Sequence, residues 1–453
     1  MAKQATLDLT EGPVLRKLLL FAFPMLLNSL INNFYSTADT VMMGRFAGTN
    51  AMAAVGASNH PLGLLINLFS GLALGVNVCC GNLLGAKKQK ELREAMHTCV
   101  TLSLIAGLVV AVFGVLLCEP LLRSLDTPEE ILADAVLYMR IRLAAGPVQL
   151  LGAFTAQIFY AHGNTRLMMV TGLISGLINV GLNVVFVPVL GMGVEGVALA
   201  TVISQVFSAA VNTAVLFAPK GAYRMTLRQF RLRINYIKDI LSVGIPNALN
   251  LLIVTVSNVL LQSAVNSFGP VLVAGNTAAD NIASYVTMIQ SVFASAALAA
   301  SAQCYGAAHY KRIDKIMKTA IITNALIVIL LDALLSWKGT QLLMLFDNDP
   351  AVARAGFPKL MFVTWGYVIF GVSMIFASGL KGIRKATTAL LCNICGMIIP
   401  RLLWVWLVIP HMHTATTLYL IYPISWAISS TAMALLYFHY RRRLEQPEKA
   451  AAV

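Results

Sequence analysis

Long apolar runs separated by short polar segments make up most of the chain. A helix that crosses a membrane needs about 20 apolar residues, and each run is long enough for one such helix. The runs lie near residues 15–38, 51–78, 94–117, 134–158, 167–187, 195–218, 238–263, 272–302, 317–336, 357–379, 386–409 and 414–438. The pattern therefore predicts an all-α integral membrane protein with twelve transmembrane helices.

The two halves of the chain repeat each other at an offset of about 220 residues. "LRKLLLFAFPMLLNSLINN" resembles "IKDILSVGIPNALNLLIVT", which pairs Pro24 with Pro246. "GNLLGAKKQKELREAM" resembles "SAQCYGAAHYKRIDKIM" in the same way. Each half then holds six spans, an even number, so both halves enter the membrane in the same orientation. We expect two six-helix lobes related by a pseudo-twofold axis along the membrane normal.

The composition fits a membrane protein, and the basic residues predict its orientation. Only 11% of the 453 residues are charged, against about 25% in soluble proteins. Of the 33 Lys and Arg residues, 25 lie in alternate segments, whereas seven, Lys359 among them, lie in the opposite ones. Because basic loops stay in the cytoplasm, we expect both termini there. The net charge of +14 then reflects topology and contact with anionic lipid, and it requires no nucleic-acid partner.

The expected domains follow from the repeat and from the basic segments. Residues 1–218 form the N-terminal six-helix lobe, 219–238 a cytoplasmic connector, 239–440 the C-terminal six-helix lobe and 441–453 a cytoplasmic tail. We expect a multi-pass protein of the cell (plasma) membrane that functions as a monomer in the lipid bilayer.

Polar residues on the first predicted span lie on one helical face. Asn28, Asn32, Ser36 and Asp39 are spaced four, four and three residues apart. A charged side chain at the bilayer centre costs about 2.5–3.5 kcal/mol, so this face is expected to line a cavity or the interior of the helix bundle. The alternative is that Asp39 lies near the outer interface, where it caps the helix end and is solvated.

The fifth and sixth predicted spans offer further polar groups. Gly172, Gly176, Asn179 and Asn183 share one face of the fifth span, and Thr201 lies on the sixth. One carboxylate, two amide oxygens and a hydroxyl suit either a proton carrier or weak coordination of Na⁺ by hard oxygen ligands. The alternative is that the two asparagines only form ordinary hydrogen bonds between helices.

Other motifs do not support an enzyme or a cofactor. "GMGVEG" fits the dinucleotide-binding pattern, but it joins two spans, and no acid follows about 20 residues later. His411 and His413 provide too few ligands for a zinc site. No Walker motif is present, so the energy for transport is expected to come from an ion gradient. We expect no cofactor, with H⁺ or Na⁺ as the coupling ion and no metal other than Na⁺ at Asp39.

The segments "FPMLLNSLIN…ADTVMMGRFAGTNAMAAVGAS", "GLALGVNVCCGNLLGAKK" and "INVGLNVVFV…GMGVEGVALATVIS" occur in this order. Nearly the whole chain resembles the multidrug and toxin extrusion (MATE) family of cation-coupled transporters. The family's first-helix acid matches Asp39, its fifth-helix pair matches Asn179 and Asn183, and its sixth-helix threonine matches Thr201. The resemblance implies that these four residues form the cation-coupling site.

This chain departs from the family pattern in two ways. Asn183 stands where the family often has an aspartate, which lowers the negative charge of the site. No acid follows the seventh-span proline in "PNALNLLIVTV", and the counterpart of Asp39 in the second repeat is Leu260 or Leu261. The ion site is therefore expected only in the N-terminal lobe. Asp280 and Asp332 are expected near the outer ends of their spans, solvated at the interface.

The resemblance implies a secondary active antiporter for multidrug (xenobiotic) efflux that exports organic cations or amphipathic compounds in exchange for H⁺ or Na⁺. Two rocking lobes would alternate access to a central cleft. The alternative is a flippase for lipid or lipid-linked oligosaccharide, which is disfavoured because only Arg401 is clearly a cation within a span. The side chains expected to line the substrate cavity are Asn28, Asn32, Tyr35, Ser36, Gln157, Asn250, Tyr285, Gln290 and Arg401.

Overall fold

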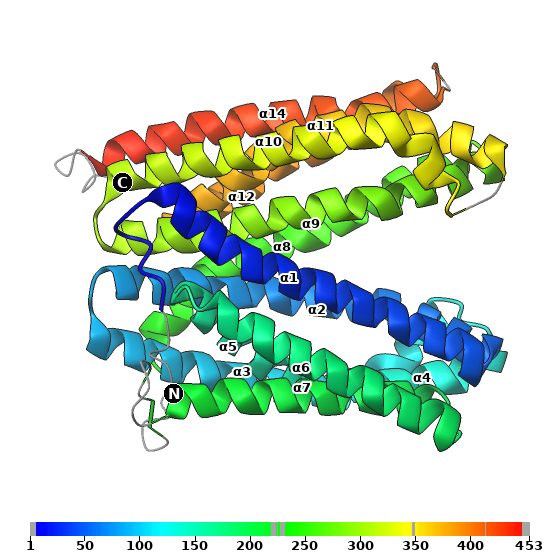
Figure 1. Ribbon diagram of the computed structural model, residues 1–453, viewed down its shortest axis with the longest axis horizontal. Helices are drawn as coiled ribbons and strands as arrows, with labels where there is room; N and C mark the ends of the chain where they lie inside the picture. Colours follow the sequence, from blue (N-terminus) through cyan, green and yellow to red (C-terminus); the bar gives the residue numbers. More distant parts are fainter. Residues whose placement is uncertain are drawn as a thin grey trace. The chain divides into compact units, whose positions relative to one another are not determined.

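The computed structural model describes residues 6–218, 223, 225–226, 232–346, 349–412 and 414–445. Throughout this part of the chain the regular elements are helices (Figure 1). Residues 219–222, 224 and 227–231 of the predicted connector lie outside the described residues, as do 446–453 of the predicted tail and His413.

Among the described residues, eleven helices are long and apolar enough to cross a membrane. Nine of them are continuous α-helices: α1 (Val14–Met42), α2 (Thr49–Gly85), α3 (Gln89–Ser124), α7 (Val194–Phe217), α8 (Ile234–Asn266), α9 (Pro270–Gly306), α10 (Tyr310–Leu343), α11 (Pro350–Gly382) and α14 (Ala415–Leu444). The other two contain a π-helical turn. In one, α6 (Thr165–Val184) continues into Val185–Val189, and in the other Ile394–Ile398 joins α12 (Ala386–Asn393) to α13 (Ile399–Leu407).

The predicted fourth span is broken into two helices, α4 (Glu129–Ala144) and α5 (Gly146–Ala161), of 16 residues each. The ψ angle of Ala145 is 7°, outside the helical range. Pro147 explains the break, because it lacks the N–H that would bond to the carbonyl oxygen of Leu143 in a continuous helix, and its ring clashes with that carbonyl. The backbone of α3 lies close to this break, since a Cβ atom on Gly107 would be 2.4 Å from the Cα of Pro147. The α4–α5 pair therefore takes the place of the fourth predicted span, and in the described part of the chain eleven single long helices correspond to the other predicted spans.

The chain packs into two compact units. The first contains Phe23–Gly244 together with residues 6–8. In this unit α5 lies against α2, α3 and α7, and it buries Phe154 and Phe159 in a core with Met96 of α3. The first turns of α8 also belong here, because a Cβ atom on Gly75 of α2 would be 2.0 Å from the carbonyl oxygen of Ile240.

The second unit contains Leu9–Ala22 and the chain from Ile245 onward. In it α11 lies against α9, α10 and α14, which run alongside it in Figure 1. Glycines permit the close approach of α9 and α11, since a Cβ atom on Gly275 would be 2.6 Å from the backbone nitrogen of Gly356. The N-terminal segment also packs in this unit, because Arg312 of α10 donates hydrogen bonds to the carbonyl oxygens of Leu9 and Glu11.

The backbone shows the internal repeat directly. α2 and α9 have 37 residues each. Residues with positive φ recur 221 positions apart, in the pairs Gly48 (90°) and Gly269 (92°), Lys87 (57°) and Ala308 (54°), and Gly163 (72°) and Arg384 (66°). The same helix ends and turns are therefore built twice along the chain.

Large apolar side chains cover the outer faces of the helices. On α3, for example, Leu108, Phe113 and Leu116 are 59%, 57% and 67% exposed. Such a surface is unfavourable in water, whereas lipid hydrocarbon solvates it well. Together with the lengths of the helices, this surface indicates a protein that is embedded in a bilayer.

Candidate functional site

A chain of hydrogen bonds in the first unit joins the four residues of the predicted coupling site. The Nδ2 group of Asn183 donates to Oδ1 of Asp39 at 2.5 Å and to Oδ1 of Asn179 at 3.3 Å. Asn179 donates in turn to the hydroxyl of Thr201 at 3.4 Å, which donates to the carbonyl oxygen of Val197 at 2.9 Å. The three helices α1, α6 and α7 thus bring one carboxylate, two amides and a hydroxyl together.

Glycines on α6 explain how α1 approaches so closely. A Cβ atom on Gly176 would be 1.5 Å from Cε2 of Tyr35, and one on Gly172 would be 2.0 Å from Oδ1 of Asn28. The Tyr35 hydroxyl also donates to the backbone oxygen of Leu173 at 3.2 Å. The one-sided pattern of small and amide residues on α6 therefore positions α1, and with it Asp39.

The environment of Asp39 is polar but shielded. Asn179 and Asn183 are 5% and 1% exposed, while Asp39 is half-buried. Among the described residues no group donates to Oδ1 of Asn183. A positive charge also acts on Asp39, that of Arg142 on α4, whose guanidinium donates to the Tyr138 hydroxyl at 3.0 Å. This arrangement can hold either a proton on Asp39 or a small cation among hard oxygen ligands.

Arg142 is a residue of this region that the sequence reasoning missed. It lies in the last turn of α4, just before the helix break. The signal was present in "YMRIRLAAGP", where two arginines occur inside an apolar run immediately before a Gly-Pro pair. A cation at such a break is expected to find a partner inside the protein.

Four other predicted cavity residues lie in the first unit. Asn28 is half-buried, and its backbone oxygen accepts a hydrogen bond of 2.9 Å from the side chain of Asn32. Ser36 is exposed. Gln157 on α5 accepts a hydrogen bond of 3.0 Å from Asn77 on α2. The first three residues thus lie on α1 with Asp39. Gln157 instead takes part in a hydrogen bond between α5 and α2.

The remaining predicted cavity residues lie in the second unit. Asn250 accepts a hydrogen bond of 2.7 Å from Asn393, Tyr285 is 53% exposed, and the fully buried Gln290 donates to the backbone oxygen of Tyr367. Arg401, which is 3% exposed, lines a cavity of about 290 Å³. Of these four predicted residues, Arg401 is the one that lines this cavity.

The cavity of the second unit also contains an ion pair that the sequence did not reveal. Lys359 on α11 is 3% exposed and pairs with Asp280 on α9. The prediction had counted Lys359 with the basic residues of the outer connections, at the edge of the span near 357–379; this is wrong because α11 begins nine residues before it, at Pro350. Pro358 lies inside the helix without interrupting it, so the apolar run placed the start of this span too late in the sequence.

The prediction that Asp332 is solvated near the outer end of its span is also wrong. Its side chain is 0% exposed, and among the described residues neither carboxyl oxygen has a hydrogen-bond partner. α10 continues to Leu343, so the helix extends about 16 Å beyond Asp332 at 1.5 Å per residue. A buried acid without partners is costly when ionised.

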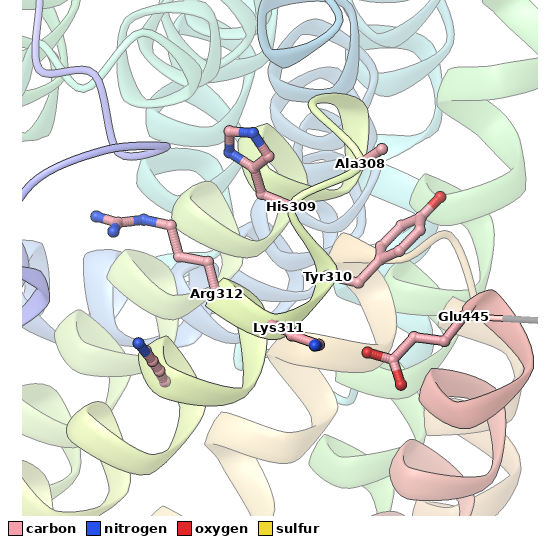
Figure 2. Close-up of a pocket in the computed structure, with 7 residues that line it drawn as sticks. Ala308, His309, Tyr310, Lys311, Arg312 and Glu445 are labelled. Carbon is pink, nitrogen blue, oxygen red and sulfur yellow. The ribbon is translucent and has the colours of Figure 1, made fainter.

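A second hollow, of about 470 Å³, lies at the turn between α9 and α10 (Figure 2). Figure 2 shows His309, Tyr310, Lys311 and Arg312 at the start of α10, and Glu445 at the end of α14. Most of its lining side chains are basic, and they lie at helix ends instead of within the spans. The hollow is therefore suited to the membrane surface and is not a candidate for the transport site.

A protein-family model, MatE, matches the chain twice, over residues 24–185 and 246–406. These segments make up more than half of the 453 residues. The chain belongs to the MATE family of transporters. Two matches to one model also show that this MATE transporter is internally duplicated, as the repeat had predicted.

Relatives and solved structures agree with this assignment. The probable multidrug resistance protein YoeA of Bacillus subtilis (strain 168) is 27% identical over 381 residues, which cover 82% of each chain. A multidrug resistance MATE family transporter of the MOP superfamily, solved in an outward-facing conformation, has a TM-score of 0.89 at 21% identity, covering 98% of this chain and 100% of its own. A MOP superfamily transporter from Pyrococcus furiosus Vc1, for which the reverse polarity of the binding pocket suggests a different function, has a TM-score of 0.90 at 20% identity, with the same coverage.

The predicted family and fold class are confirmed by these matches. This MATE protein is an all-helical, multi-pass membrane protein, and it is a transporter, not an enzyme. Its multidrug-transporter relatives imply small molecules as substrates.

Proposed function

We propose that this MATE transporter exports organic cations or amphipathic compounds from the cell in exchange for H⁺ or Na⁺. The observation that carries the proposal is the hydrogen-bonded Asp39, held by Asn183 on the inner face of α1 and α6. An ionised carboxylate in this position is costly in a membrane, and binding of a proton or Na⁺ during transport would neutralise it. The naming of the relative YoeA as a probable multidrug resistance protein supports the substrate class.

The exchange follows from the hydrogen bond between Asn183 and Asp39. When Asp39 is ionised, the N–H donor of Asn183 stabilises it and ties α1 to α6. When a cation neutralises Asp39, this charge-assisted bond weakens, and α1 is free to bend at Pro24, which lies inside the helix. Ion binding from outside would thus favour release of substrate, and loss of the ion to the cytoplasm would reset the cycle by alternating access.

The amide groups are compatible with either H⁺ or Na⁺ as the coupling ion, but they would face Asp39 differently in the two cases. Asn183 presents N–H to the carboxylate, and Asn179 presents N–H to Thr201. Coordination of Na⁺ would require the amide oxygens to face the carboxylate instead. A proton needs only one oxygen of Asp39. The proposal also places both termini in the cytoplasm and the transporter in the plasma membrane as a monomer.

The proposal is tested by dye efflux in everted membrane vesicles, first under a pH gradient and then under a sodium gradient. The variant is Asp39→Asn, and the matched control is Asp134→Asn, the same chemical change on α4 outside the hydrogen-bonded chain. We expect the wild type and the control to accumulate dye when the gradient is imposed, and Asp39→Asn to lose the response to that gradient. Gradient-driven efflux of normal size in Asp39→Asn would contradict the coupling role.

A further inference from the structure

The cavity of the second unit is lined by charged side chains that have no part in the proposed ion exchange at Asp39. Its lining contains three ionisable charged side chains, Asp280, Lys359 and Arg401. The other lining groups include amides of α8 and α9 and the aromatic rings of α11 and α14. Two of the charged residues, Lys359 and Arg401, are each 3% exposed. Their partners decide what the cavity can bind.

Lys359 is already neutralised by the protein. Its ammonium group pairs with Oδ1 of Asp280 and donates to Oδ1 of Asn276 at 2.8 Å. The second oxygen of Asp280 accepts from Asn276 at 3.1 Å. Asp280 and Lys359 therefore cancel each other's charge, and the ammonium group has two of its three donors occupied.

Arg401 has no such partner. Its Nε donates to the hydroxyl of Ser425 at 3.1 Å, and its guanidinium carbon lies 4.8 Å and 5.8 Å from the ring centres of Tyr422 and Trp426. Among the described residues no carboxylate lies within ion-pair distance of it, and Asp332 does not line the cavity. Arginine stays charged in proteins, so the cavity carries one uncompensated positive charge.

The terminal N–H groups of Arg401 are available for a ligand. Within the described part of the chain, Ser425 is the acceptor that Arg401 has, and it is bonded through Nε alone. The two terminal nitrogens form a planar fork that matches the two oxygens of a carboxylate or phosphate. A buried cation without an anion is costly, and an oxyanion at this fork would remove that cost.

The aromatic lining defines the rest of the ligand. Trp426 lies 5.1 Å from Tyr367 and 5.0 Å from Phe370 between ring centres, with interplanar angles of 30° and 33°. All three rings line the cavity, and such surfaces favour flat aromatic groups. The volume of about 290 Å³ is at the lower limit of small-molecule pockets. A compound with one or two fused rings fits this space.

We propose that this cavity binds small aromatic compounds that carry a carboxylate or phosphate, and that Arg401 recognises the anionic group. The site would then select compounds by a negative charge, which a simple organic cation lacks. The inference rests on the proposed function in one respect only, namely that the bound compound is a substrate that the protein transports. Binding itself does not depend on Asp39 or on any ion gradient.

The test measures binding to the purified full-length protein in detergent by isothermal titration calorimetry, with empty micelles as the blank. The probes share one ring system: 2-naphthoate, 2-naphthyl phosphate, methyl 2-naphthoate and 2-naphthylmethylammonium. We expect at least one of the two anions to bind at least about tenfold more tightly than the ester and the ammonium compound, equivalent to about 1.4 kcal/mol. The stronger of the two anions identifies the oxyanion that the fork prefers.

Three variants assign the effect to the guanidinium. Arg401→Gln is expected to abolish the preference for the anions, and Arg401→Lys to retain only part of it, because lysine keeps the charge but loses the fork. Arg354→Gln, which removes an exposed arginine of the same helix as Lys359, is expected to bind as the wild type does. Thermal unfolding of each variant establishes that it is folded.

Two outcomes would overturn the inference. One is a wild type that binds the ester or the ammonium compound as tightly as both anions, a result that needs no variant. The other is an anion preference that persists in folded Arg401→Gln. Neither outcome affects the coupling role of Asp39, because no gradient is present. Conversely, gradient-driven efflux of normal size in Asp39→Asn, together with intact anion binding, would refute the coupling role of Asp39 and leave this site unchanged.

Discussion

Replacement of Asn183 by leucine tests how the protein sets the affinity of Asp39 for its ion. The two side chains branch at the same atom, although leucine is the larger, so the change replaces the N–H donor that lies 2.5 Å from Oδ1 of Asp39 with an apolar group. This donor stabilises the ionised carboxylate and not the protonated one. Its loss should therefore let Asp39 take up a proton at higher pH.

The size of the shift follows from the hydrogen bond that is lost. A hydrogen bond to a charged group contributes about 1.5–3 kcal/mol, and one pH unit corresponds to about 1.36 kcal/mol. The bond is made inside the protein by an amide that is 1% exposed, but Asp39 itself is half-buried. Solvent can therefore replace part of the bond, and the lower half of the range applies, a shift of about 1 pH unit.

The assay is the pH dependence of dye efflux in vesicles, measured at fixed gradient size for the wild type and for Asn183→Leu. Asn183→Asp should shift the midpoint upward as well, because a second carboxylate disfavours ionisation of the first. Asn212→Leu is the matched control, since Asn212 is an equally buried amide, 2% exposed, further along α7. An Asn183→Leu midpoint that is unchanged, or lower than that of the wild type, would refute the reasoning.

Three further substitutions test the packing. Gly176→Leu should abolish efflux in a protein that still reaches the membrane, because the new side chain occupies the position of the Tyr35 ring; normal efflux would contradict the close approach of α1. Lys359→Met should lower the free energy of unfolding by about 1–3 kcal/mol, less than for a fully buried pair because the side chain of Asp280 is 53% exposed; an unchanged melting temperature would contradict this. Gly107→Leu should prevent stable expression, because its Cβ would lie 2.4 Å from the backbone at the start of α5; a wild-type level of folded protein would show that α3 does not pack there.

The sequence predicted most of the spans because membrane helices leave a strong local signal. Runs of about 20 apolar residues are rare elsewhere, and the repeat gave an independent check on their order. The fourth span shows the limit of this reasoning. The apolar run continues through Ala145, so composition gave one helix, whereas the Gly-Pro pair and the contact with Gly107 of α3 make two.

The candidate site was predictable where the polar residues follow helical periodicity. Asn179 and Asn183 are four residues apart, and the structure places both against the helices that carry Thr201 and Asp39; their role in coupling stays a prediction. The partners of Lys359 were not predictable in this way. Its contacts reach Asn276 and Asp280, 83 and 79 residues away in the chain, and no local pattern records such a pairing.

Counterflow of ions is the most direct test of the central claim that Asp39 couples substrate export to an ion. Proteoliposomes would be loaded with substrate and a trapped pH-sensitive dye, and then diluted so that the outward substrate gradient is the sole driving force. We predict acidification of the lumen with wild-type protein and its absence with Asp39→Asn, or, if the ion is Na⁺, uptake of ²²Na⁺ that is lost in the same variant. Ion counterflow of equal size in Asp39→Asn and wild type would contradict the account.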